Sequence, residues 1–235
     1  MRIWENPQVV AVNRVNGHVP AVPFDRLEPA LTANKKESPW YRCLNGEWQF
    51  AYGEDADAMV AAAGAGSISA WDRIQVPGNW TMQGYDKPHY VNVQMPFYEQ
   101  PPHVPAVNPT GVYQRTFTLP AEWDGRQIFL CFDGVESAFF LWINGQSIGY
   151  SQDSRLPAEF DITGYVQPGE NTLTAAVIRW SDGSFLEDQD HWRMAGIHRD
   201  VFLYAVPKRH IFDYFVRAEL DDKYRNATLL VDVQA

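Results

Sequence analysis

The sequence predicts an all-β fold, a β-sandwich of jelly-roll type. Short runs rich in β-branched and aromatic residues recur through the middle of the chain, and several alternate with period two. Turn residues separate these runs, and the chain contains 16 glycines and 16 prolines. Between Trp71 and Pro207 no stretch has the pattern of a long amphipathic helix. Many short strands joined by turns are typical of antiparallel sandwiches.

The predicted strands cover residues 111–120, 127–134, 137–145, 171–180 and 199–206. Asn144-Gly145 predicts a two-residue hairpin, because a type I′ turn needs positive φ at both central positions. The segment Asn108-Pro109-Thr110-Gly111 predicts a tight turn with proline at its second position. Residues 55–67, "DADAMVAAAGAGS", predict one or two helical turns before the glycines end them.

Three parts are predicted along the chain. Residues 1–39 mix proline, asparagine and charge and predict an extended arm lying on a surface, with 31–38 especially polar. Residues 40–207 form the sandwich. Residues 208–235 predict two strands around a turn at 221–224. Because two strands cannot bury a core alone, we expect 208–235 to begin a second, truncated domain.

Composition limits the partners. The net charge is −10 without any block of lysine and arginine, which argues against nucleic acid and anionic lipid. The absence of a signal peptide pattern and of a long apolar run predicts a cytoplasmic protein that does not bind membranes. Cys43 and Cys131 have no metal-binding or redox spacing, so we expect two buried free thiols.

The stretch "RWSDGSFLEDQDHWRMAGIHRD", residues 179–200, holds five carboxylates, three arginines, two histidines and two tryptophans. It connects two predicted strands, so residues 181–198 are expected to form a long loop at one rim of the sandwich. Long loops are often functional. A purely structural loop is equally compatible with the pattern: Arg193 and Arg199 would pair with Glu187, Asp188 or Asp200, while Trp180 and Trp192 would cover the core.

Three functional alternatives fit the same loop. A calcium loop is weakly supported, because the ladder of alternating aspartates is missing. A pair of catalytic carboxylates would suit a glycosidase, yet no acid stands in an apolar context that would keep it protonated. Sugar binding fits best, since carboxylates accept hydrogen bonds from hydroxyls and tryptophan faces cover the CH side of a pyranose. The chain has nine tryptophans.

Longer segments carry a specific resemblance. "LNGEWQF" (44–50), "VPGNWTMQGYDKPHYVNVQMPF" (76–97), "GYSQDSRLPAEFD" (149–161) and "RWSDGSFLEDQD" (179–190) occur in this order. Together with residues 4–7 and most of 40–235, they closely resemble the N-terminal sugar-binding domain of glycoside hydrolase family 2, specifically bacterial β-galactosidases of the lac-operon type. The resemblance implies a galactose-binding-domain-like jelly roll, with 208–235 starting an immunoglobulin-like domain. The catalytic glutamates of such enzymes lie in a later TIM barrel, so the rim carboxylates would bind substrate without cleaving it.

The resemblance also implies roles for single residues. Asp190 would bind galactose hydroxyls and ligate a sodium ion, and Asn92 and Val93 would reach the same galactoside substrate. Trp192, Arg193 and Arg199 would support Asp190. His191 and His198 are interpreted as packing or surface residues.

A possible magnesium site is implied between the arm and the sandwich. Asn6, the backbone of Val9, Gln152 and Asp182 would supply oxygen ligands. The family's arm carboxylate is replaced here by Ile3, so weaker binding is expected. The arm also resembles a segment that assembles the intact enzyme into a tetramer.

The sequence therefore predicts the N-terminal part of a retaining β-galactosidase that hydrolyses terminal β-D-galactosides such as lactose. This chain would contribute substrate-binding and ion-binding residues and would be inactive without the barrel. An autonomous carbohydrate-binding module or lectin is one alternative, and a purely structural assembly domain is another.

Overall fold

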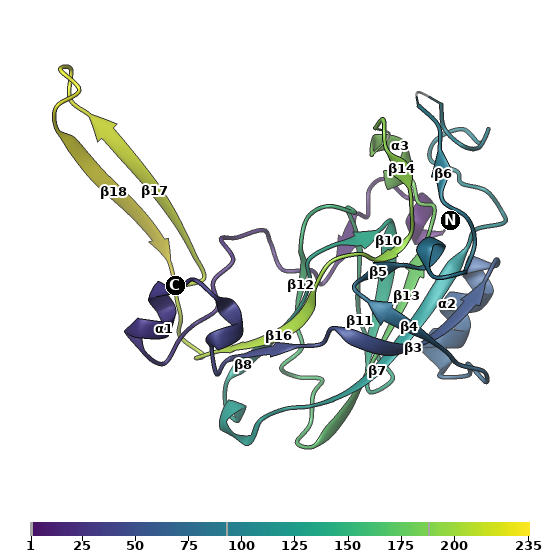
Figure 1. The fold of residues 1–235 in the computed structure, drawn as a ribbon, viewed down its shortest axis with the longest axis horizontal. Helices are drawn as coiled ribbons and strands as arrows, with labels where there is room; N and C mark the ends of the chain where they lie inside the picture. The colour runs from purple at the N-terminus through teal and green to yellow at the C-terminus, as the bar shows by residue number, and fades with distance from the viewer. Residues whose placement is uncertain (1, 93, 188) are drawn as a thin grey trace.

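Two antiparallel sheets packed face to face form the body of the chain, as the computed structural model shows for residues 2–92, 94–187 and 189–235 (Figure 1). The larger sheet contains, in spatial order, β1 (Ala11–Val12), β11 (Gln146–Gln152), β10 (Ala138–Ile143), β13 (Glu170–Ile178), β7 (Thr110–Thr118), β3 (Gly46–Gly53) and β4 (Asp72–Val76). The smaller sheet contains β12 (Ala158–Asp161), β8 (Gln127–Phe132), β16 (Val201–Val206) and β2 (Tyr41–Cys43). The predicted all-β sandwich is confirmed.

The core lies between these two sheets. Its largest fully buried side chains are aromatic or branched: Trp48, Trp80, Trp123, Tyr113, Phe50, Phe132, Phe139, Phe160, Leu130, Leu141 and Ile143. Each such side chain contributes about 1.5–3 kcal/mol when it leaves water. The loops at the rims of the sandwich therefore extend from a well-buried core.

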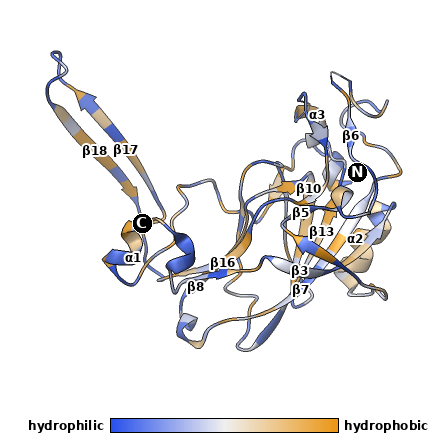
Figure 2. Cartoon of the chain, viewed as in Figure 1, coloured by the Kyte–Doolittle hydropathy of each residue, from blue (hydrophilic) through white to orange (hydrophobic). Residues whose placement is uncertain are grey.

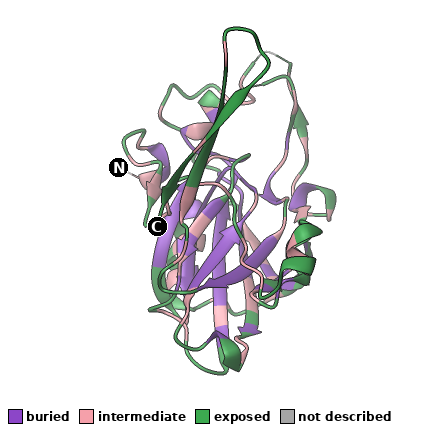
Figure 3. Cartoon of the chain, turned by 90° about the vertical axis from the view of Figure 1, so that its left-hand side faces the viewer, coloured by how far each residue is buried: buried purple, intermediate pink, exposed green. Residues whose placement is uncertain are grey.

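The outer faces of both sheets are also covered. Helix α2 (Ala56–Ala65) packs its Met59 and Val60 on the larger sheet. The N-terminal arm places Trp4 on the same sheet and Val15 on the smaller one. Strands β10, β13 and β16 are consequently buried along almost their whole length (Figure 3). Burial on both faces explains why these strands read as continuous apolar runs without strict alternation.

The five predicted strands correspond to β7, β8, β10, β13 and β16. Between β10 and β11, Asn144 has φ 52° and Gly145 has φ 75°, as the predicted type I′ turn requires.

The predicted turn at 108–111 is wrong. Thr110 and Gly111 already belong to β7. Asn108 instead continues the pairing through its side chain: its Nδ2 donates to the Trp180 carbonyl at 2.8 Å, and its Oδ1 accepts from the Trp180 amide at 3.0 Å. Gly111 allows the Phe50 ring to pack closely against β7, because a Cβ at this position would lie 2.6 Å from that ring.

Helix α2 is longer than the one or two turns predicted, since it spans ten residues. Asp55 caps its N-terminus by accepting a hydrogen bond from the Ala58 amide at 3.0 Å. Gly64 lies inside the helix, where an added Cβ would lie 3.3 Å from the Trp142 ring, a tight contact. Gly66, with φ 63°, ends it.

The arm is extended only in part. Strand β1 pairs with β11, but helix α1 (Leu27–Leu31) and the 3-10 turn η2 (Lys35–Glu37) replace the extended segment expected at 31–38. Asn34 favours η2 because its side chain accepts a hydrogen bond from the Lys36 amide at 3.2 Å. The other short 3-10 turns are η1 (Ile3–Glu5), η3 (Trp80–Met82) and η4 (Ala121–Trp123).

Neither cysteine is in a disulfide. Cys131 is buried as predicted, and burial raises the pKa of its thiol. Cys43 is exposed, which corrects the prediction of two buried thiols. It lies on β2 at the edge of the smaller sheet, with its side chain pointing outward.

Residues after Pro207 form a two-stranded hairpin, β17 (Asp213–Leu220) and β18 (Ala227–Gln234), that projects from the body (Figure 1). At its tip the Asp221 carboxylate accepts hydrogen bonds from the amides of Lys223 and Arg225. Polar and apolar residues are mixed along both strands (Figure 2). Both faces of the hairpin are largely exposed.

Gly149 in β11 faces the arm, so we predict that Gly149→Ala loosens it. The new Cβ would clash with the Val12 carbonyl oxygen and would lie 2.8 Å from the Phe160 ring. Overpacking of this kind costs about 1–3 kcal/mol. Urea unfolding should show the loss, and limited trypsin digestion should cut the arm faster.

Gly164→Ala is the matched control, because nothing lies within 4 Å of its added Cβ. If the arm of the Gly149→Ala protein were as resistant to trypsin as the wild type, the close approach of β1 to β11 would not be what holds the arm.

Candidate functional site

Two segments far apart in sequence meet at one rim of the sandwich. Strands β6 (His89–Tyr90) and β14 (Trp192–Arg193) both lie at this rim (Figure 1). They pair, so that Tyr90 lies opposite Trp192. The rim segment 181–198 is thus not a loop without secondary structure. It also contains α3 (Gly183–Leu186) and β15 (Gly196–Ile197), which pairs with β5 (Gly78–Asn79) and β9 (Val135–Glu136).

The pairing brings together two of the predicted substrate-binding residues. Asp190 lies two residues before Trp192, and Asn92 lies two residues after Tyr90. Both residues therefore lie next to the same short ladder, which ends at the pair of Tyr90 and Trp192. Both side chains are exposed. Val93, the third predicted residue, lies outside the described residues.

A tyrosine holds the Asp190 carboxylate. The Tyr90 hydroxyl donates a hydrogen bond to Asp190 Oδ1 at 2.8 Å. This hydrogen bond and the negative charge of Asp190 raise the pKa of Tyr90, so the phenol remains a donor at neutral pH. The Tyr90 ring also packs on Trp192, with 5.5 Å between ring centroids.

A buried guanidinium ties both strands of this rim to the core. Arg179 directly follows β13 and is 2% exposed. Its Nη1 pairs with the carboxylate of Asp86, which precedes β6, and its Nη2 donates to the carbonyl of Arg193 in β14 at 3.1 Å. One side chain therefore fixes the spacing of the two segments that carry Asn92 and Asp190.

Glu187 links the rim segment to Ser154, which follows β11. Its carboxylate accepts from the Ser154 amide at 2.7 Å and from the Ser154 hydroxyl at 2.5 Å. Glu136 lies nearby, where its Oε1 accepts from the Met194 amide at 3.2 Å. Burial raises the pKa of Glu136, and the positive charge of Arg155, 3.5 Å away, opposes that rise.

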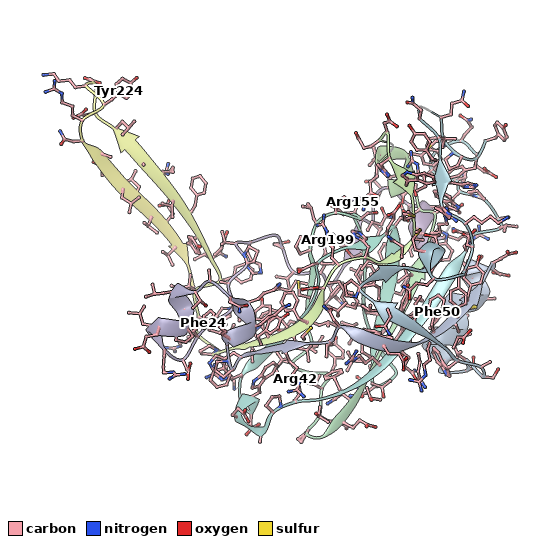
Figure 4. The ribbon with its side chains drawn as sticks, in the orientation of Figure 1. Phe24, Arg42, Phe50, Arg155, Arg199 and Tyr224 are labelled. Atoms are coloured by element: carbon pink, nitrogen blue, oxygen red, sulfur yellow. The ribbon has the colours of Figure 1, made fainter. Side chains whose placement is uncertain are left out.

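The residues expected to support Asp190 divide into two groups. Trp192 contacts Tyr90 and so supports Asp190 indirectly, while Arg193 contributes its backbone to the same ladder. Arg199 lies elsewhere: it donates to the Arg155 carbonyl at 2.7 Å (Figure 4). Asp200, one of its suggested partners, accepts from Asn45 at 2.8 Å. Asp188 lies outside the described residues.

The ring nitrogens of the two histidines on this segment face backbone carbonyls. His191 Nδ1 faces the Trp192 carbonyl at 2.8 Å. His198 Nε2 faces the Ser154 carbonyl at 2.8 Å, and burial lowers the pKa of its imidazole.

A second candidate site lies where the arm crosses the sandwich. Gln152 Nε2 donates to Asp182 Oδ1 at 2.5 Å. The Asp182 amide donates to the Trp4 carbonyl and the Gln152 amide to the Val10 carbonyl, so arm residues 4–10 pass beside both side chains. Within this arm segment the Val9 amide donates to the Asn6 carbonyl at 2.9 Å. All four residues implied as magnesium ligands therefore lie in one region.

Their chemistry fits a hard cation. Amide, backbone and carboxylate oxygens are the ligands that Mg²⁺ prefers. Asp182 is 8% exposed, and burial raises its pKa, so a nearby cation would favour its charged form. Ile3 packs among apolar neighbours of Trp4 and supplies no charge. With one carboxylate among the four residues, the affinity should be modest.

Sequence reasoning did not single out Tyr90, Arg179 or Asp86. Tyr90 stands two residues before Asn92, and a period-two pattern could have placed both on one face. Nothing in the sequence indicates that Arg179 bridges the two segments, because its partners are 93 and 14 residues away.

Comparison with known proteins shows the family to which this chain belongs. Residues 41–207 match the family model "Glycosyl hydrolases family 2, sugar binding domain". The β-galactosidase of Priestia megaterium is 48% identical over 236 residues, covering 97% of this chain and 23% of that protein. The β-galactosidase of Vibrio cholerae is 48% identical over 235 residues, covering 98% of this chain and 22% of that protein. This chain thus spans less than a quarter of these relatives.

A solved structure is also similar. The β-glucuronidase of an uncultured Clostridium species superposes with a TM-score of 0.63 at 25% identity, covering 83% of this chain and 33% of that chain. None of the helices among the described residues is both long and apolar enough to cross a membrane.

We predict that Arg179→Lys loosens the β6–β14 ladder. A lysine ammonium is a point charge and lacks the fork with which arginine reaches Asp86 and the Arg193 carbonyl together. Hydrogen exchange of the amides in β6 and β14 should accelerate at least several-fold, and unfolding should cost about 1–3 kcal/mol less than in the wild type.

Arg217→Lys is the control, because Arg217 makes an exposed ion pair with Asp232 on the distant hairpin. If amide hydrogen exchange in β6 and β14 were unchanged in the Arg179→Lys protein, the ladder would not depend on the bridge that Arg179 forms between Asp86 and the Arg193 carbonyl.

Proposed function

Because this chain belongs to the sugar-binding domain family of the family 2 glycosyl hydrolases, we propose that it is the N-terminal part of a retaining β-galactosidase that hydrolyses terminal β-D-galactosides. The names of its relatives support this activity. The observation that carries the proposal is that Asp190 and Asn92 are both exposed and lie next to the same short β6–β14 ladder.

The rim is suited to recognition of sugar hydroxyls. An ionised carboxylate only accepts hydrogen bonds, whereas the Asn92 amide both donates and accepts. Tyr90 and Trp192 present exposed aromatic faces beside these groups, with exposed fractions of 50% and 54%. A pyranose ring offers both chemistries, since its edges carry hydroxyls and its faces carry C–H groups.

In this proposal bond cleavage takes place in a barrel domain of the longer enzyme, which carries both catalytic glutamates. The rim of the present chain closes one side of that pocket and binds the non-reacting part of the sugar. Such contacts position the substrate for the reaction that occurs next to it. The greater length of the relatives supports this division between domains.

Two ions belong to the proposal. Asp190 would ligate a sodium ion at the sugar, since its carboxylate is exposed. Asn6, Val9, Gln152 and Asp182 would hold magnesium where the arm crosses the sandwich. We also propose that the intact enzyme is a cytoplasmic tetramer in whose assembly the arm takes part.

Asp190→Asn in the full-length enzyme tests the proposal. The amide keeps the shape of the side chain but removes its charge and one acceptor oxygen. Hydrogen bonds to charged groups contribute about 1.5–3 kcal/mol, so kcat/KM for a galactoside should fall about 10- to 150-fold. Activation by sodium should also weaken.

Asp222→Asn, at the tip of the exposed hairpin, is the matched control and should behave as the wild type. Hydrolysis by Asp190→Asn with unchanged kcat/KM and unchanged sodium dependence would support a structural role for this domain instead.

The magnesium proposal has a separate test in thermal unfolding. At ten times its dissociation constant a ligand stabilises the folded state by about 1.4 kcal/mol, which raises Tm by about 3–6 °C for a domain of this size. Magnesium should produce this rise in the wild type, and EDTA should reverse it. Asp182→Asn should abolish the rise, whereas an equal rise in both proteins would place the ion elsewhere.

A further inference from the structure

We propose that Tyr90 is a positioning residue for sugar recognition: its hydroxyl fixes the Asp190 carboxylate in the orientation that receives the galactoside. This inference rests on the function proposed above, because it assigns the reason why Asp190 is presented to the ligand in one orientation.

The contact leaves part of the carboxylate free for a ligand. Tyr90 uses Asp190 Oδ1 as its acceptor, at 2.8 Å. A carboxylate offers about four acceptor positions on its two oxygens. The lone pairs of Oδ2 thus remain available to a sugar hydroxyl or a cation, while the plane of the carboxylate is set by the bond at Oδ1.

The tyrosine is itself held in place. Its backbone pairs with Trp192 in the β6–β14 ladder, and its ring lies against the Trp192 indole at an interplanar angle of 38°. Arg179 fixes the ladder from the core through Asp86 and the Arg193 carbonyl. A phenol has only two side-chain torsions, and here the ring contact restricts both.

A turn before β14 brings Asp190 to Tyr90. Asp190 lies two residues before Trp192, the partner of Tyr90 in the ladder. The His191 amide donates to the Gln189 carbonyl at 2.8 Å, so the chain turns at Asp190. The Tyr90 hydroxyl reaches the Asp190 carboxylate at this turn.

Fixing an exposed carboxylate in advance reduces the entropy that the ligand must remove on binding. Asp190 lies on an exposed stretch without its own strand or helix, where its side chain would otherwise sample several rotamers. The expected signature of a positioning role is weaker ground-state binding with little change in the chemical step.

Tyr90→Phe in the full-length enzyme tests the inference, because it removes only the hydroxyl and keeps the ring on Trp192. KM for a galactoside should rise about 5- to 20-fold, while kcat should change less than about 2-fold. Isothermal titration calorimetry with galactose should show a weakening of the same size. The sodium concentration that gives half-maximal binding of galactose should also increase.

Tyr224→Phe is the matched control, since this exposed tyrosine lies at the tip of the hairpin, far from the rim (Figure 4). It should leave KM, galactose affinity and sodium dependence unchanged.

The double variant Tyr90→Phe/Asp190→Ala, compared with Asp190→Ala, identifies the route of the effect, because alanine leaves the Tyr90 hydroxyl no acceptor at position 190. If Tyr90 acts through Asp190, its substitution should add little once Asp190 has been replaced. A full additive loss in the double variant would overturn the inference, because Tyr90 would then act independently.

The two proposals fail in different ways. If Asp190→Asn weakens galactose binding and Tyr90→Phe matches the wild type, the positioning role is wrong and the proposed function stands. If Asp190→Asn has no effect on galactose binding, the proposed function itself is wrong.

Discussion

Burial of the larger sheet on both faces is the constraint on which the rest of the structure depends. The smaller sheet covers its inner face, and α2 and the arm cover its outer face. A strand that is buried on both sides has every backbone group paired and every side chain packed, so it moves little. Arg179 directly follows such a strand, β13. Its hydrogen bond to the Arg193 carbonyl therefore holds the rim in place relative to the sheet.

The sequence predicts the central strands because β-branched and aromatic runs between turn residues have few other stable arrangements. It also predicts the Asn144-Gly145 hairpin, whose geometry is decided within two residues. The sequence-based predictions fail where contacts with residues distant in sequence determine the local structure. Asn108 forms strand-like hydrogen bonds with Trp180, 72 residues away, and the Trp142 ring packs close to Gly64 inside α2. Local patterns contain no information about either partner.

The candidate site also contains residues that the sequence predicts and residues that it does not. Asp190 and Asn92 could be selected from motifs, since the matching segments are long and specific. The side chains that position them could not, because Tyr90 and Asp190 are 100 residues apart. Only the pairing of β6 with β14 makes them neighbours. The magnesium candidates likewise depend on the path of the arm, which the sequence describes as extended without giving its course.

The two ends of the larger sheet are protected by different means. At one end, the arm contributes β1 and occupies the hydrogen-bonding groups of β11. At the other, β4 is short and its residues Asp72, Arg73 and Gln75 are exposed. Unpaired strand edges invite association with other chains, and charges or an added strand discourage it. The N-terminal arm, which crosses the candidate cation site, therefore also covers a sheet edge and so disfavours edge-to-edge aggregation of the domain.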